Sequence, residues 1–88
     1  MYFVYVLRST ITRRLYIGSS ENPLKRLMEH NSGCVQSTKP YRPYIIVYTK
    51  SYEAKSEGVK REKQLKKSGR MRKELKKKVT NMALSSNG

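Results

Sequence analysis

The chain has 88 residues, with 20 Lys and Arg against 6 Asp and Glu and a formal net charge of +14 at pH 7. This length predicts one small domain with a thin core. The charge makes a neutral partner a poor first hypothesis and favours a polyanion, of which nucleic acid is the commonest.

Hydropathy and cysteine content narrow the class of protein further. No stretch approaches the roughly 20 apolar residues that a membrane span needs, so we expect no membrane partner. The apolar start lacks the basic region and cleavage site of a signal peptide. Cys34 is the only cysteine, which excludes a disulfide framework and argues against a zinc cluster. We therefore expect a cytoplasmic, monomeric protein.

The first two elements form a predicted β-hairpin. Residues 2–7 are aromatic and β-branched, residues 8–14 are polar enough for a loop, and residues 15–18 form the returning strand. If the loop is symmetric, Tyr5 lies opposite Tyr16 on one face of the sheet. Alternation divides the first strand into two faces, Phe3, Tyr5 and Leu7 against Tyr2, Val4 and Val6.

A helix is predicted to follow the hairpin, from Pro23 to about residue 31. Asn22 is a good N-cap, Pro23 suits the first helical position, and Gly33 suits the end. Arg26 and His30 lie four residues apart and so share one face. The predicted apolar stripe of this helix is Leu24, Leu27 and Met28.

The clearest strand is Tyr44 to Thr49, after a loop over residues 34–43. Its continuous apolar run is typical of a strand covered on both faces, and we expect it to be the central strand of the sheet.

Two further helices are predicted, over residues 53–67 and 70–79, separated by Ser68 and Gly69. In the first, Glu62 lies three residues from both Val59 and Leu65, on the side expected to be buried. A carboxylate there must find a cation, a hydrogen-bond donor or a metal. The stripes are Ala54, Gly58, Val59, Glu62 and Leu65 in one helix and Met71, Leu75 and Val79 in the other.

These elements predict an α+β fold, a small three-stranded antiparallel sheet flanked by helices in the order β-β-α-β-α-α. We expect one domain over residues 1–79 and a flexible tail over residues 80–88.

Basic residues are concentrated late in the chain. From Lys60 to Lys78, 11 of 19 residues are Lys or Arg, with little compensation by acids. The alternative to a binding patch is a solvated helical face, and Tyr41, Arg42 and Tyr44 could extend the patch. The predicted nucleic-acid-binding residues are Arg14, Lys25, Arg42, Lys60, Arg61, Lys63, Lys66, Lys67 and Arg70.

The order of residue types along these elements resembles the GIY-YIG nuclease family, and within it the small stand-alone bacterial proteins of the UPF0213 type. Phe3-Val4-Tyr5 stands at the first signature and Tyr16-Ile17-Gly18 matches the second. The resemblance extends from Tyr2 to about Leu75. It departs from the family where Phe3 replaces the glycine of the first signature. The ordered set that matches is Tyr5, Tyr16, Arg26, His30 and Glu62.

The resemblance implies a metal-dependent endonuclease that hydrolyses phosphodiester bonds of DNA, with these five residues as the catalytic set. Glu62 would hold one Mg²⁺ or Mn²⁺, and Arg26 would bind the phosphate. The chain has no aspartate and few glutamates, which favours one ion over two. Tyr5, aided by the cation and by Tyr16 or His30, would activate water, if positive charge lowers its pKa from about 10. The final proton acceptor stays open.

Other interpretations apply to each residue and to the whole. Tyr5 and Tyr16 could be ordinary sheet residues, Arg26 an ion-pair partner of Glu29 or Glu62, and His30 a helix-end residue favoured by the helix dipole. The second functional hypothesis is a non-catalytic module that binds DNA or RNA. Larger family members add domains that choose the target, so a targeting protein is a further expected partner. Little sequence specificity is expected without an element that reads base edges.

Overall fold

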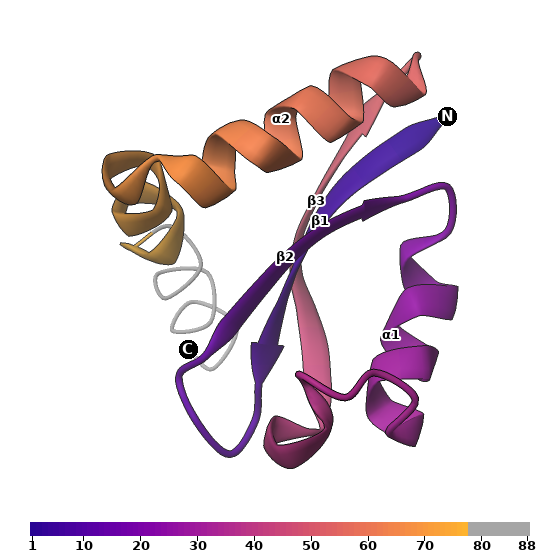
Figure 1. The fold of residues 1–88 in the computed structure, drawn as a ribbon, viewed down its shortest axis with the longest axis vertical. Helices are drawn as coiled ribbons and strands as arrows, with labels where there is room; N and C mark the ends of the chain where they lie inside the picture. The colour runs from indigo at the N-terminus through magenta and orange to yellow at the C-terminus, as the bar shows by residue number, and fades with distance from the viewer. Residues whose placement is uncertain (78–88) are drawn as a thin grey trace, which may run out of the picture.

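The computed structural model describes residues 1–77 and is shown in Figure 1. Its elements confirm the predicted α+β order, and residues 69–77 form the last helical segment. Val79 and the predicted tail lie outside the described residues. The elements are β1 (Tyr2–Ser9), β2 (Leu15–Ser20), α1 (Pro23–Ser32), the 3₁₀ turn η1 (Lys39–Tyr41), β3 (Tyr44–Tyr52) and α2 (Lys55–Lys67).

The three strands form one antiparallel sheet in the order β2-β1-β3. The prediction that Tyr44 to Thr49 is central was therefore wrong, because β1 occupies that position and β3 is an edge. In β1 the run from Val4 to Leu7 is completely buried, whereas in β3 only Tyr44 is buried, the other residues are half-buried or exposed, and Ile45 is among the exposed ones. An apolar run here indicates that a face of the strand is covered, but it does not indicate where the strand lies in the sheet.

The hairpin register differs from the symmetric prediction by two residues. Tyr5 pairs with Gly18, and Tyr16 pairs with Leu7. Because side chains alternate with a period of two, this shift keeps Tyr5 and Tyr16 on one face. Their rings lie diagonally, with centroids 6.5 Å apart.

The helices cover opposite faces of the sheet (Figure 1). The face toward α2 is apolar and also receives Leu75 from residues 69–77. The face toward α1 is built largely from aromatic residues. The buried members of the two clusters are Val4, Val6, Ile17, Leu65 and Leu75 on the α2 side, and Tyr5, Leu7 and Tyr44 on the α1 side.

Helix α1 has the predicted ends, but of its predicted apolar stripe only Leu27 packs against the core. Asn22 accepts a hydrogen bond from the Lys25 backbone, and Gly33 ends the helix with a φ of 87°. Leu24 and Met28, however, are 67% and 71% exposed. The helix instead buries His30, a polar residue that the apolar pattern could not include.

Candidate active site

The five predicted catalytic residues gather around the edge strand β2. Tyr5 and Tyr16 come from the sheet face that α1 covers, and Arg26 and His30 come from α1 itself. Glu62 comes from α2, on the opposite side of the sheet. The connection around the edge is Lys66, which contacts Glu62 and lies over the Tyr16 ring.

Gly18 makes room for the Tyr5 side chain. A Cβ atom at Gly18 would lie 2.6 Å from both Cζ and the hydroxyl oxygen of Tyr5. The glycine of the second signature therefore has a packing reason, since only a residue without a side chain lets the phenol cross β2 at this point. The pairing of Tyr5 with Gly18 in the register is part of the same arrangement.

Tyr5 is 1% exposed, and burial raises the pKa of its hydroxyl to about 12. The neighbouring Tyr16 raises this pKa further, while the guanidinium of Arg26 opposes the shift. The expectation that positive charge lowers the Tyr5 pKa was wrong, because burial outweighs Arg26. Tyr5 therefore keeps its proton at neutral pH, and its oxygen accepts from the Arg26 guanidinium.

His30 is 2% exposed and contacts the ring of Tyr16, with centroids 4.5 Å apart. Its Nδ1 lies 2.8 Å from the hydroxyl of Thr38, and that hydroxyl donates to the Val35 carbonyl. Because the hydroxyl has a single proton, it accepts from His30 Nδ1–H, which leaves the lone pair on Nε2. Burial lowers the His30 pKa, and the charge of Arg26 acts in the same direction.

The helix-end interpretation of His30 is therefore not supported. A residue held by the helix dipole would be charged and exposed, whereas this imidazole is buried and neutral.

Glu62 has two partners, and neither is Arg26. The hydroxyl of Ser19 donates to Oε1, and the ammonium of Lys66 lies 2.6 Å from Oε2. The side chain of Glu62 is 20% exposed, so the carboxylate lies at the rim rather than in the core. The prediction that this carboxylate needs a cation or a donor was correct, since it has one of each.

Arg26 pairs with Glu29 at 3.1 Å, as one alternative interpretation proposed, and its guanidinium also interacts with Tyr5. It borders a pocket of about 370 Å³ next to Ser19. The pocket is lined by residues of β1, β2, α1 and α2 and of the turn before α1: Tyr2, Ser19, Ser20, Glu21, Asn22, Lys25, Arg26, Glu29 and Lys55.

The residues present fit a single divalent cation at Glu62. Within residues 1–77 no group of three or more His, Cys, Asp or Glu side chains forms a cation cage. The carboxylate already accepts the Lys66 ammonium at Oε2, so a positive group is accommodated there. One hard oxygen ligand, with water and phosphate oxygens completing the shell, is a known manner of binding Mg²⁺.

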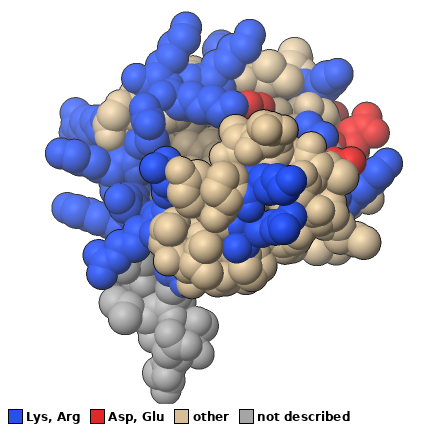
Figure 2. Space-filling model, turned by 60° about the horizontal axis from the view of Figure 1, so that its bottom comes forward, with Lys and Arg blue, Asp and Glu red and all other residues tan. Residues whose placement is uncertain are grey.

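The predicted basic residues divide into several environments. Lys66 contacts Glu62, Arg14 stacks on the Tyr41 ring at 4.2 Å, and Arg61 is half-buried. Tyr44 is 4% exposed, so the prediction that it extends the patch was wrong. Figure 2 shows Lys and Arg side chains over much of one face, with small acidic areas. The remaining predicted residues, Lys25, Arg42, Lys60, Lys63, Lys67 and Arg70, are exposed.

The structure adds to the site two residues that the sequence did not indicate, Ser19 and Thr38, and gives Lys66, predicted only to bind nucleic acid, a place beside Glu62. Ser19 holds Glu62, Thr38 orients His30, and Lys66 connects Glu62 to Tyr16. The pair of Glu62 and Lys66 has a spacing of i, i+4, which is a recognisable helical ion pair. Ser19 and Thr38 carry no comparable signal, since their partners lie far away in the chain.

The comparison with known families agrees with this geometry. The family model described as GIY-YIG catalytic domain matches residues 1–76. The chain belongs to the GIY-YIG family. Membership implies nuclease-like function and contact with nucleic acid in general, and nucleases of this family generally use a divalent metal.

Similar GIY-YIG proteins include UPF0213 proteins of Staphylococcus aureus strains Mu3 and N315. Each is 38% identical to this chain over 66 residues, which covers 74% of this chain and 79% of the relative. A solution NMR structure of the UPF0213 protein BH0048 from Bacillus halodurans is also similar, with a TM-score of 0.52 and 27% identity. The match covers 85% of this chain and 81% of that one.

No helix among residues 1–77 combines the length and apolar character needed to cross a membrane.

Proposed function

We propose that this GIY-YIG domain hydrolyses phosphodiester bonds of DNA with the help of one divalent cation and with little sequence specificity. The observation that carries the proposal is the convergence of Tyr5, Tyr16, Arg26, His30 and Glu62 around β2. These residues come from four elements on two faces of the sheet, and each has a partner that fixes its side chain.

Arg26 is the phosphate-binding group in this proposal. Its guanidinium is 48% exposed at the pocket rim and offers a planar fork of donors to two phosphate oxygens. The Tyr5 hydroxyl lies beside it and keeps its proton, because burial raises its pKa to about 12. Because Tyr5 is only 1% exposed, it orients the phosphoryl group or the attacking water through Arg26, whose guanidinium it positions.

His30 is the proton acceptor in this proposal. Its imidazole is neutral at pH 7, since burial lowers its pKa, and Nε2 carries the lone pair. Because the ring is 2% exposed, the proton must pass through a neighbour. Tyr16 is half-buried and its ring contacts the imidazole. In this proposal its hydroxyl would pass its own proton to Nε2 of His30 and take one from the attacking water.

Glu62 would hold the divalent cation, Mg²⁺ or Mn²⁺, with Ser19 supporting its other oxygen. When bound, the cation supplies charge stabilisation for phosphoryl oxygens. The Lys66 ammonium must leave Oε2 for this, because two cations would repel one another at one oxygen. Lys66 then becomes a free positive group beside the phosphate.

The surface supports binding without base recognition. The charge of +14 attracts phosphates of any sequence, and no described element has the form of a helix dedicated to base reading. A targeting partner that selects the substrate is therefore also part of the proposal.

A second candidate is a module that binds DNA or RNA without cutting it. One observation favours it, since Glu62 is paired with Lys66 and Arg26 with Glu29. Phe3 in place of the signature glycine does not add to this case. Phe3 lies in β1. No non-glycine residue among those described has a positive φ, so a side chain is tolerated at Phe3 without backbone strain.

The test is a cleavage assay with Mg²⁺ or Mn²⁺ on plasmid, single-stranded, branched and RNA substrates. We expect Glu62→Gln and Arg26→Gln each to lose about 10²–10³-fold of the cleavage rate, with binding largely kept. Glu57→Gln is the matched control, because Glu57 is an exposed glutamate on the same helix. It should cleave like the unaltered protein.

Three results would separate the candidates. Cleavage that chelation and Glu62→Gln both abolish supports the nuclease. Salt-sensitive binding with no cleavage of any substrate supports the binding module. Cleavage that survives in both variants contradicts the assignment of the site.

A further inference from the structure

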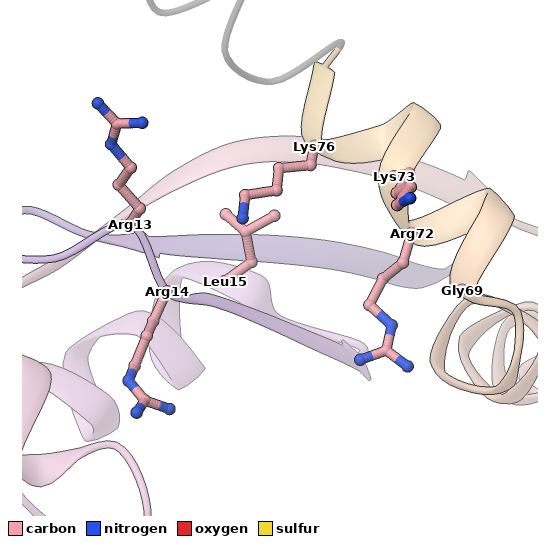
Figure 3. A pocket seen from close by; sticks show the side chains of 7 residues that line it. All are labelled: Arg13, Arg14, Leu15, Gly69, Arg72, Lys73 and Lys76. Atoms are coloured by element: carbon pink, nitrogen blue, oxygen red, sulfur yellow. The ribbon is translucent and has the colours of Figure 1, made fainter.

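A second pocket, of about 610 Å³, lies between the loop that joins β1 to β2 and the helical segment of residues 69–77 (Figure 3). All the residues that line it, except Leu15 and Gly69, are basic. They are Arg13, Arg14, Arg72, Lys73 and Lys76. No carboxylate within the described part of the chain lines this pocket, in contrast to the pocket beside Arg26.

Both walls of this basic pocket are attached to the core. On the sheet side Leu15 packs against the apolar cluster, and the backbone N–H of Ser9 donates to the Arg14 carbonyl at 3.0 Å. On the helical side Leu75 is 7% exposed and Met71 packs beside it. The basic side chains therefore extend from a rigid scaffold and keep their spacing.

Two of the guanidinium groups are held in place by the protein. Arg14 lies over the Tyr41 ring at 4.2 Å, and Arg72 donates from Nη2 to the Lys66 carbonyl at 2.8 Å. The contact of Arg72 restricts that side chain before a ligand arrives, which lowers the entropy cost of binding. Arg14 is held toward Tyr41 and points away from Arg72 and Lys76 (Figure 3). The fork of a guanidinium matches the oxygens of a phosphate. A basic pocket without a carboxylate is therefore a better site for a phosphate than for a neutral ligand.

The basic pocket and the candidate active site lie along the same open edge of the sheet. Leu15, at the pocket, begins β2, and Ser19, the partner of Glu62, lies near its end. Four strand residues at about 3.3 Å each separate them by roughly 13 Å. A separation of this size is within the reach of one nucleic-acid strand that contacts both places.

We propose that the basic pocket binds backbone phosphates of the nucleic-acid strand whose scissile phosphate lies beside Arg26 and Glu62. This inference rests on the proposed function for the identity of its ligand. It adds a flanking phosphate site that fixes the strand along β2. Arg13, Arg72, Lys73 and Lys76 were not among the binding residues that the sequence indicated, and the pocket brings them together.

The test compares two double variants of equal net charge. Arg13→Gln with Lys73→Gln removes two exposed pocket charges and leaves Arg72 with its backbone contact. Lys39→Gln with Lys50→Gln removes two exposed charges outside this pocket and is the control. Binding of a short DNA duplex is measured against salt concentration, and circular dichroism verifies the fold of each variant.

We expect the pocket variant to flatten the slope of log K against log salt by about 1.8, the value for two lost phosphate contacts to duplex DNA. The control should leave the slope unchanged. Where cleavage is observed, the pocket variant should raise KM and leave kcat unchanged, because the pocket does not touch the reacting phosphate.

Equal slopes for the two double variants would overturn the inference, since the effect would then be one of net charge alone. A fall in kcat with KM unchanged would also overturn it. Failure of the nuclease proposal is a separate result, because the salt slope can be measured on a protein that cleaves nothing.

Discussion

The two faces of the sheet differ in the chemistry of what they bury. The face under α2 is apolar, and its buried residues are Val4, Val6, Ile17, Leu65 and Leu75. The face under α1 buries phenols and an imidazole, with Tyr5, Leu7, His30 and Tyr44 as its buried members and Tyr16 half-buried beside them.

A buried polar group costs stability unless it is hydrogen-bonded, so a small domain has reason to avoid it. His30 is satisfied by Thr38, and the Tyr5 hydroxyl by Arg26. We infer that the α2 face supplies most of the stability and that the α1 face holds the groups that do chemistry. Glu62 belongs to the stable helix but reaches the other face around β2 through Lys66.

The largest effect on stability is expected from the apolar face. Leu65→Ala should lower the free energy of unfolding by about 2–5 kcal/mol, because Leu65 is 5% exposed and leaves a cavity. The midpoint temperature of thermal unfolding should fall by several degrees for each kcal/mol of stability lost. Leu24→Ala is the control, since this leucine is 67% exposed and should change stability by about 0.5 kcal/mol or less. A slower cleavage rate in the folded Leu65 variant would contradict the separation of roles.

The second-largest effect on stability is expected on the aromatic face, where Gly18 packs against Tyr5. In Gly18→Ala the new Cβ would lie 2.6 Å from Tyr5, so we expect a loss of about 1–3 kcal/mol and reduced cleavage. The control is Gly69→Ala, because a Cβ there meets nothing within 4 Å. It should be neutral or stabilising by up to about 1 kcal/mol. Equal stability of the two variants, measured by urea unfolding, would argue against the close packing of Tyr5.

The third effect is a pH dependence from His30. Burial lowers its pKa below 6.5 in the folded protein, so the unfolded state binds more protons as the pH falls through that range. Stability should therefore fall as the pH drops from about 7 to about 5 and rise in the opposite direction. His30→Gln should remove this contribution. An equally steep dependence in the variant would assign the titration to another group.

The smallest effect concerns the exposed pair of Arg26 and Glu29, whose side chains are 48% and 36% exposed. Glu29→Gln should change stability by about 0.5 kcal/mol or less, because exposed ion pairs contribute little. It should tighten DNA binding by freeing Arg26. Glu53→Gln, another exposed glutamate, controls for net charge. Weaker binding in Glu29→Gln alone would mean that Glu29 positions the guanidinium for phosphate.

The elements and their order could be predicted from the sequence because each has a local signal. Asn22 and Gly33 mark the ends of α1, and alternation marks the two faces of β1. The order of the strands could not, because an apolar run such as Tyr44 to Thr49 does not indicate its neighbours. The predicted apolar stripe of α1 was wrong at Leu24 and Met28, which are exposed, because α1 buries a histidine instead.

The resemblance to the GIY-YIG family implied the set of five site residues, but their electrostatics depend on the fold. The pKa of Tyr5 follows from its burial beneath Gly18 and Arg26, which only the packing determines. The partners of Glu62 and His30, Ser19 and Thr38, come from other elements. Long-range hydrogen bonds of this kind have no periodicity by which a sequence could reveal them.

The most direct test of the account is the cleavage rate of Tyr5→Phe under single-turnover conditions with saturating protein. Phenylalanine fills the same space beside Gly18 and removes only the buried hydroxyl. The account predicts a rate at least about 10²-fold lower with DNA affinity unchanged. Cleavage at the rate of the unaltered protein would contradict it, because the aromatic face would then be a core like the other one.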